Sequence, residues 1–194
     1  MKLSETVNKV REFVQEKCIQ HKANPKYGLY DYWNDHIKRV VYHAVQLANE
    51  RGADTEIVEL AALLHDISMP SEYGERSAHH IYSAEMAENL LKELDYPSEK
   101  IAIVRKCVFN HKGRNAHLRD TAEDICISDA DALAHFDRIP SLFKLAFSVL
   151  NMGLEEGRDY VKARLQGDYD GLSERLKSAY KSKFDVIMET VFVD

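Results

Sequence analysis

Residues 61–66, Ala-Ala-Leu-Leu-His-Asp, constrain the fold more than any other stretch of this chain. Four apolar residues lead directly into a histidine and an aspartate, so we expect a buried helix that delivers an imidazole and a carboxylate together. Burying both groups costs free energy unless a partner compensates for their lost hydration. A divalent metal ion is such a partner, because histidine nitrogen and aspartate oxygen are common ligands of Zn, Mn, Fe and Ni.

Apolar residues recur at intervals of three and four positions along most of the chain, and no segment alternates as a strand would. We therefore predict an all-α fold, with Ser4 and Asp54 as helix caps and Gly52 as a helix stop. The expected helices cover residues 4–20, 31–51, 54–66, 78–94, 97–111, 121–131, 140–152, 155–166 and 173–191.

Further histidines and acids occur on both sides of the central His-Asp pair. In chain order the potential ligands are His36, His65, Asp66, His79, His80, His111 and Asp131. His36 is followed three residues later by Arg-Val, and Asp131 lies within Asp-Ala-Asp-Ala-Leu. In this order and with these flanking residues, the chain resembles the HD-domain superfamily of metal-dependent phosphohydrolases.

The resemblance covers about residues 30–140 and implies a helical bundle for that part. We expect residues 1–29 to form an N-terminal helix that packs on this HD domain. Residues 141–194 are expected to form extra C-terminal helices that complete the same domain. The apolar stripe of the last helix predicts packing either on the body of the protein or on a second subunit, as in a homodimer.

By this resemblance, His36, His65, Asp66 and Asp131 form one metal site. Neighbouring side chains diverge by about 100° on an ideal helix. His65 and Asp66 can therefore face one ion only if the helix ends there, or if Asp66 bridges two ions. Asp129 is expected to be a cap or a surface residue.

Some members of the superfamily hold a second ion through two further histidines. His111, followed by Lys112, matches the second of these. For the first, both His79 and His80 are candidates, and a small residue four positions later favours His79, with Ser83. We expect a two-metal site; the alternative is a single-metal enzyme whose additional histidines contact substrate phosphate.

This ligand set suits one or two divalent transition-metal ions (Mn, Fe, Ni, Zn or Co), and Mg remains an option. The resemblance implies a phosphohydrolase that attacks a nucleotide or another small phosphate ester or anhydride with a metal-bound hydroxide. Phosphomonoesterase, phosphodiesterase and pyrophosphohydrolase activities all stay open. Asp66 is expected at the centre of catalysis. Lys112 and Arg39 flank ligand histidines and are candidates to stabilise the phosphate oxygens, although Arg39 could equally pair with a buried acid.

Two other functions are compatible with the same ligands. Some relatives use a di-iron pair to activate oxygen, and iron with oxygen uptake and no phosphate release would indicate that chemistry. The domain could also be a catalytically silent ligand-binding domain, which turnover of any phosphate ester would exclude.

The composition narrows the partners and the location of the protein. A net charge of −6 argues against a nucleic-acid-binding protein, which normally carries a basic face. No apolar run approaches the roughly 20 residues that cross a bilayer, and no hydrophobic signal core follows Met1, so we expect a cytoplasmic protein with no membrane partner. The three cysteines are widely spaced and are expected to be buried thiols rather than disulfides or zinc ligands.

Overall fold

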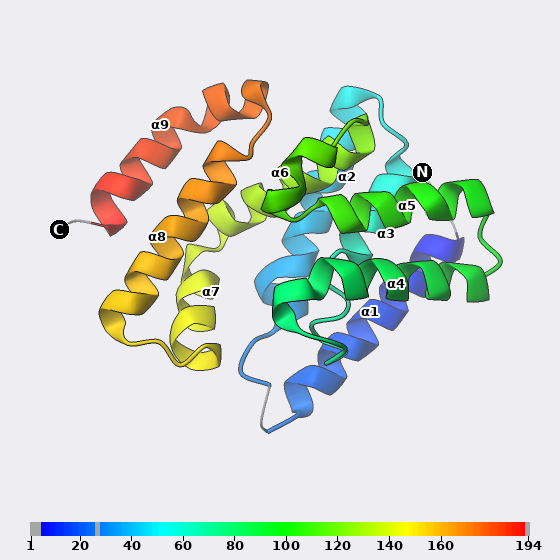
Figure 1. The fold of residues 1–194 in the computed structure, drawn as a ribbon, viewed down its shortest axis with the longest axis horizontal. Coiled ribbons are helices and arrows are strands. Elements are labelled where there is room, and N and C mark those ends of the chain that lie inside the picture. The colour runs from blue at the N-terminus through cyan, green and yellow to red at the C-terminus, as the bar shows by residue number, and fades with distance from the viewer. Residues whose placement is uncertain (1–4, 26–27, 193–194) are drawn as a thin grey trace.

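The computed structural model of the protein describes residues 5–25 and 28–192, and within these ranges the chain is helical with no strand (Figure 1). The all-α prediction is therefore confirmed. The predicted cap Ser4 lies outside the described residues. Among the described helices, none combines the length and the apolar character that a bilayer crossing requires.

The element boundaries follow the predicted helices closely. In chain order the α-helices are α1 (Glu5–Ala23), α2 (Lys38–Arg51), α3 (Thr55–Leu64), α4 (His79–Glu93), α5 (Ser98–Asn110), α6 (Ala122–Asp137), α7 (Ile139–Lys144), α8 (Leu154–Asp170) and α9 (Glu174–Val191). The shorter helical turns are η1 (Trp33–Ile37), η2 (Arg76–Ala78), η3 (Gly113–Leu118) and η4 (Leu145–Val149).

Helix α3 lies at the centre of the fold, in contact with α1, α2, α4, α5 and α6. All its residues from 57 to 64 are buried, and each fully buried leucine contributes about 1.5–3 kcal/mol to stability. Asp54 caps the helix as predicted, accepting hydrogen bonds from the backbone N–H groups of Glu56 (3.1 Å) and Ile57 (3.2 Å). The capped, buried helix holds its C-terminal end, and the His-Asp pair after it, in a fixed position.

Helices α7, α8 and α9 cover one side of the body formed by α1–α6 (Figure 1). Helix α8 packs on α6, and α9 packs on α8. The Phe184 side chain of α9 is buried and stacks on Tyr169 of α8, with ring centroids 4.1 Å apart. The apolar stripe of α9 thus packs partly on the body, while Val186 and Val191 are exposed.

The cysteines confirm the prediction of buried thiols. Cys18, Cys107 and Cys126 are all free and buried. Burial raises the pKa of Cys18 to about 12 and also raises the pKa of the other two thiols.

Asp129 is buried, with 1% of its surface exposed, which corrects the expectation of a cap or surface residue. Its carboxylate accepts hydrogen bonds from Arg51 Nη2 (2.6 Å), the Ser173 backbone N–H (2.8 Å) and the Ser173 hydroxyl (2.6 Å). Arg51 ends α2, and Ser173 precedes α9. The buried carboxylate therefore joins α2, α6 and the start of α9.

We expect Asp129→Ala to lower the free energy of unfolding by about 3–5 kcal/mol, because it leaves the Arg51 guanidinium largely buried without its carboxylate. Urea denaturation measures the change. The matched control is Asp185→Ala on α9, which removes an exposed ion pair with Lys181 and should cost about 0.5 kcal/mol or less. A loss below about 1 kcal/mol for Asp129→Ala would contradict the structural role of this carboxylate.

Candidate metal centre

Six of the predicted ligand residues meet at one place, although they come from separate parts of the chain. His36 lies in η1, His65 and Asp66 directly follow α3, His79 begins α4, His111 follows α5, and Asp131 lies in α6. They form two groups, and within each group the ligand atoms lie within 4.8 Å of one another. One group is His36 with His65 and Asp131, and the other is Asp66 with His79 and His111.

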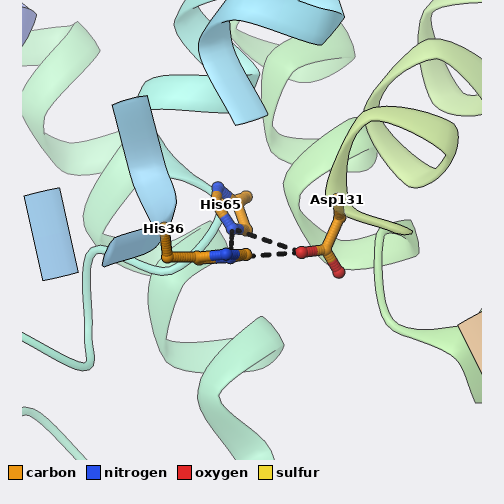
Figure 2. A group of neighbouring side chains, drawn as sticks. All are labelled: His36, His65 and Asp131. Carbon is orange, nitrogen blue, oxygen red and sulfur yellow. Dashed lines mark hydrogen bonds and ion pairs between the residues drawn. The ribbon is translucent and has the colours of Figure 1, made fainter. Parts of the chain in front are cut away.

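The first group brings two imidazoles against one carboxylate (Figure 2). The Nε2 atoms of His36 and His65 lie 3.0 Å apart. Asp131 Oδ1 lies 3.1 Å from His36 Nε2 and 4.0 Å from His65 Nε2. All three residues are buried, so their polar atoms face one another instead of bulk water.

In the second group, the Nε2 atoms of His79 and His111 lie 3.1 Å apart. Asp66 Oδ1 is 3.4 Å from His79 Nε2 and 3.6 Å from His111 Nε2. The other oxygen of Asp66, Oδ2, lies 3.7 Å from His36 Nε2 and 3.6 Å from His65 Nε2. One carboxylate oxygen therefore faces each group.

His65 and Asp66 follow directly after α3, which ends at Leu64. The backbone of His65 still has helical angles (φ −56°, ψ −36°), so the two side chains leave the chain in different directions. Both reach the cluster because Asp66 lies between the two groups of ligands. The structure satisfies both conditions set by the sequence: the helix ends at the pair, and Asp66 lies between two groups of ligands.

Backbone hydrogen bonds determine which ring nitrogen of three imidazoles carries hydrogen. In each, Nδ1 contacts a carbonyl oxygen three residues earlier: His65 with Ala62 (2.7 Å), His79 with Arg76 (2.9 Å) and His111 with Val108 (2.6 Å). A carbonyl oxygen only accepts, so Nδ1 must be the donor and Nε2 of the neutral ring carries a lone pair. His79 and His111 thus direct two lone pairs at each other, an arrangement that repels unless a cation lies beside them.

His111, Asp66 and Asp131 have the protonation states that a metal ion requires. Burial lowers the pKa of His111 to about 3, so this imidazole is neutral at pH 7. Burial alone would raise the pKa of Asp66, but the surrounding imidazoles outweigh it and hold the pKa below its usual value. For Asp131, His135, His36 and Arg164 likewise outweigh burial and lower the pKa. Neutral imidazoles and ionised carboxylates are the forms that bind metal.

The donor set fits one or two divalent ions. Two ligand atoms that bind one ion tetrahedrally lie roughly 3.4 Å apart, close to the spacings within both groups. Asp66 Oδ1 is buried and accepts no hydrogen bond from the described residues, as a carboxylate oxygen reserved for an ion would. Nitrogen and oxygen donors together suit Mn, Fe, Ni, Zn or Co.

The structure does not bring His80 to either group. Its buried ring lies against Phe109, with centroids 5.3 Å apart. Ser83, four residues after His79, donates a hydrogen bond to Ser68 Oγ (3.0 Å) and accepts one from the Ser68 backbone N–H (3.1 Å). The small residue therefore holds the turn after Asp66 against α4.

Arg39 also lies away from the cluster, which corrects the expectation that it faces the substrate phosphate. Its guanidinium lies 6.0 Å from the centroid of the Tyr42 ring, and both residues line a separate cavity that also includes His43 and Asp137. Ile37 and Lys38 have regular α-helical backbone angles, and side chains three positions apart on an α-helix point about 60° apart. For this reason Arg39 faces the cavity beside Tyr42 while His36 faces the ligand groups.

Lys112 lies at the site as predicted and lines a cavity of 230 Å³ beside both ligand groups. Its ammonium group donates a hydrogen bond to the Ser77 carbonyl oxygen. A second cavity of 500 Å³ adjoins the first, and His79, His111, Lys112, Asp131 and Arg164 line both.

Sequence reasoning missed three polar residues beside the ligands. The His135 ring stacks on His36, with centroids 4.8 Å apart, and its Nδ1 lies 3.0 Å from Asp168 Oδ2. Arg164 Nη2 lies 3.6 Å from Asp131 Oδ2. His135 could have been found from its position four residues after Asp131 on one helix face, whereas no sequence signal connects α8 to the site.

We expect His79→Ala to reduce the bound metal by about one ion per chain, because it removes one of the few donors of the second group. His80→Ala is the matched control and should retain the wild-type content, since His80 lies outside both groups. Elemental analysis of proteins purified without chelator measures both. Loss of metal in His80→Ala with normal content in His79→Ala would contradict the assignment.

Comparisons with known proteins agree with this geometry. A family model described as the HD domain matches residues 34–135. An uncharacterized protein of Clostridium beijerinckii is 26% identical over 91 residues, which cover 43% of this chain and 58% of that protein. A tRNA (cytidine(56)-2'-O)-methyltransferase of Thermoplasma volcanium is 26% identical over 150 residues, 70% of this chain and 41% of that enzyme. The chain thus spans about half the length of these relatives.

Solved structures share the fold over nearly the whole chain. Bacillus subtilis YpgQ has a TM-score of 0.68 at 19% identity, covering 98% of this chain and 94% of YpgQ. YpgQ in complex with ADP has a TM-score of 0.67 at 19% identity, with 95% and 93% covered. A predicted HD superfamily hydrolase from an uncultured Thermotogales bacterium has a TM-score of 0.57 at 21% identity, with 92% and 91% covered. With the family model matching more than half of its residues, this chain belongs to the HD-domain family.

Proposed function

We propose that this protein is a metal-dependent phosphohydrolase that cleaves a nucleotide or another small phosphate ester or anhydride. The main support for the proposal is the position of Asp66. Its two carboxylate oxygens face separate groups of ligands, at 3.4–3.7 Å from the histidine Nε2 atoms. Two ions that share a carboxylate are a common arrangement for phosphoryl chemistry, because together they can stabilise the attacking and the leaving oxygens.

The residues of the chain hold and orient such a centre. Six side chains would bind the ions: His36, His65, Asp66, His79, His111 and Asp131. When bound, a divalent ion lowers the pKa of a coordinated water to about 7 and so supplies a nucleophile at neutral pH. The Nδ1–carbonyl hydrogen bonds of His65, His79 and His111 keep Nε2 directed at the centre, because a fixed second contact sets both the tautomer and the ring orientation.

The surroundings of the centre support a small anionic substrate. The cavity of 230 Å³ includes Arg76, Lys112 and Arg164 together with Tyr30 and Tyr160. Asp66 and Asp131 line the same cavity, so the three cations leave its lining with one excess positive charge, although the whole chain carries a net charge of −6. A charged cleft concentrates ligands of opposite sign. The complex of the similar YpgQ with ADP supports a nucleotide as the phosphorylated group.

We expect Asp66→Ala to lower phosphate release by about 100-fold or more and to reduce the bound metal, because this carboxylate belongs to both groups. A screen of nucleotides for phosphate and pyrophosphate release, paired with elemental analysis, measures both effects. The matched control is Asp159→Ala, an exposed aspartate on α8, which should retain activity and metal. A folded Asp66→Ala protein with full activity would contradict the mechanism, and oxygen uptake without phosphate release would favour a di-iron oxygenase.

Removal of metal should destabilise the fold, because an ion bound only by the folded state adds about 2.7 kcal/mol of stability at 100 times its dissociation constant. We expect the melting temperature to fall on chelation and to recover when Mn is restored. Differential scanning fluorimetry measures the shift. The same melting temperature with and without chelator, in protein that contained metal before treatment, would contradict the coupling between the centre and the fold.

A further inference from the structure

We propose that Arg164, on α8, binds the substrate phosphate at this centre and that Asp168 positions it. The inference rests on the proposed phosphohydrolase function and names the cation that recognises a phosphate dianion. Arg164 lies outside the residues that the HD family model matches, 34–135. The recognition of substrate would therefore come from the C-terminal helices and the binding of metal from the HD region.

Arg164 lies at the boundary between the two cavities of the site, and its side chain lines both. Its Nη2 atom is 3.6 Å from Asp131 Oδ2, which places the guanidinium directly beside the first ligand group. A phosphate bound next to the metal centre would lie within reach of this group.

The guanidinium retains donors for a ligand. A guanidinium carries five N–H donors. Within the described part of the chain, the Nε and Nη2 atoms of Arg164 are those that lie near acids, at 3.3 Å from Asp168 and 3.6 Å from Asp131. The Arg164 side chain is 41% exposed. Burial would lower the pKa of Arg164, but Asp168 and Asp131 outweigh it and raise the pKa, so the positive charge persists.

Among the described residues, the other cations of the two cavities contact uncharged oxygens of the fold. Arg119 donates hydrogen bonds to the carbonyl oxygens of Asn110 (2.9 Å), His111 (2.9 Å) and Lys112 (3.1 Å). Arg76 donates to the Tyr32 hydroxyl (2.9 Å), and Lys112 to the Ser77 carbonyl oxygen. Arg164 instead lies at ion-pair distances from Asp131 and Asp168, and the planar guanidinium matches phosphate oxygens in pairs.

Asp168 holds the guanidinium in place. It lies one helical turn after Arg164, and its Oδ1 is 3.3 Å from Arg164 Nε. Its second oxygen, Oδ2, lies 3.0 Å from Nδ1 of His135, the residue that stacks on the ligand His36. One carboxylate thus orients the predicted phosphate-binding group and a neighbour of the metal ligands together.

The test compares binding of inorganic phosphate, and of ADP, to manganese-loaded full-length variants by isothermal titration calorimetry. Arg164→Met should weaken phosphate binding about 10-fold or more, the effect of losing a charged hydrogen bond, while retaining wild-type metal content and melting temperature. Arg164→Lys should fall between Arg164→Met and wild type, because it keeps the charge but loses the paired donors. Asp168→Asn should raise KM for a nucleotide that the wild type cleaves more than it lowers kcat, because Asp168 positions the group that binds the substrate phosphate. Lys162→Met, on the same helix but lining neither cavity, is the matched control and should bind phosphate as the wild type does.

Wild-type affinity for phosphate in a metal-loaded Arg164→Met protein would overturn the inference while leaving the proposed function intact. Loss of metal from Arg164→Met would also overturn it, because the residue would then act through Asp131 rather than on the substrate. If the wild-type protein releases neither phosphate nor pyrophosphate from any nucleotide and binds no phosphate, the proposed function fails and this inference fails with it.

Discussion

Lone pairs of neighbouring imidazoles face each other in the interior, and the rest of the architecture serves to keep them there. His79 and His111 each donate Nδ1–H to a backbone carbonyl oxygen, so in the neutral rings the Nε2 lone pairs face each other at 3.1 Å. Such a contact is stable only with a cation nearby, because a buried polar group without a partner costs several kcal/mol. The packing of the surrounding helices stabilises the fold enough to offset this free-energy cost and holds the groups in place.

The two parts of the chain contribute different chemistry to the same place. The HD region supplies all six proposed metal ligands. Five of them lie at helix ends or in turns around the buried α3, and Asp131 lies within α6. Helices α7 and α8 line the site, and α8 adds Arg164 and Asp168. The buried carboxylate of Asp129 joins the two parts through Arg51 and Ser173, so the covering helices keep a defined position relative to the metal centre.

Local patterns in the sequence were enough to predict the helices and the Asp54 cap, because each depends on a few neighbouring residues. The ligand positions came from the resemblance to the HD family, and the structure brings six of those seven residues together. The spacing of residues along the sequence could not predict contacts between elements that are far apart in the chain. Asp129 is enclosed by Arg51 and Ser173, which are far from it in the sequence, and Arg164 reaches the site because α8 packs on α6. The direction of Arg39 likewise depends on how α2 packs, which its position three residues after His36 does not determine.

The central claim is that Asp66 lies between two metal ions. A crystal of the full chain grown with manganese, with diffraction recorded at the manganese absorption edge, tests it directly. The account predicts two anomalous peaks, one beside His36, His65 and Asp131 and one beside His79 and His111, with an oxygen of Asp66 on each. Peaks elsewhere in the molecule, or none at these side chains in protein that elemental analysis shows to contain manganese, would contradict it.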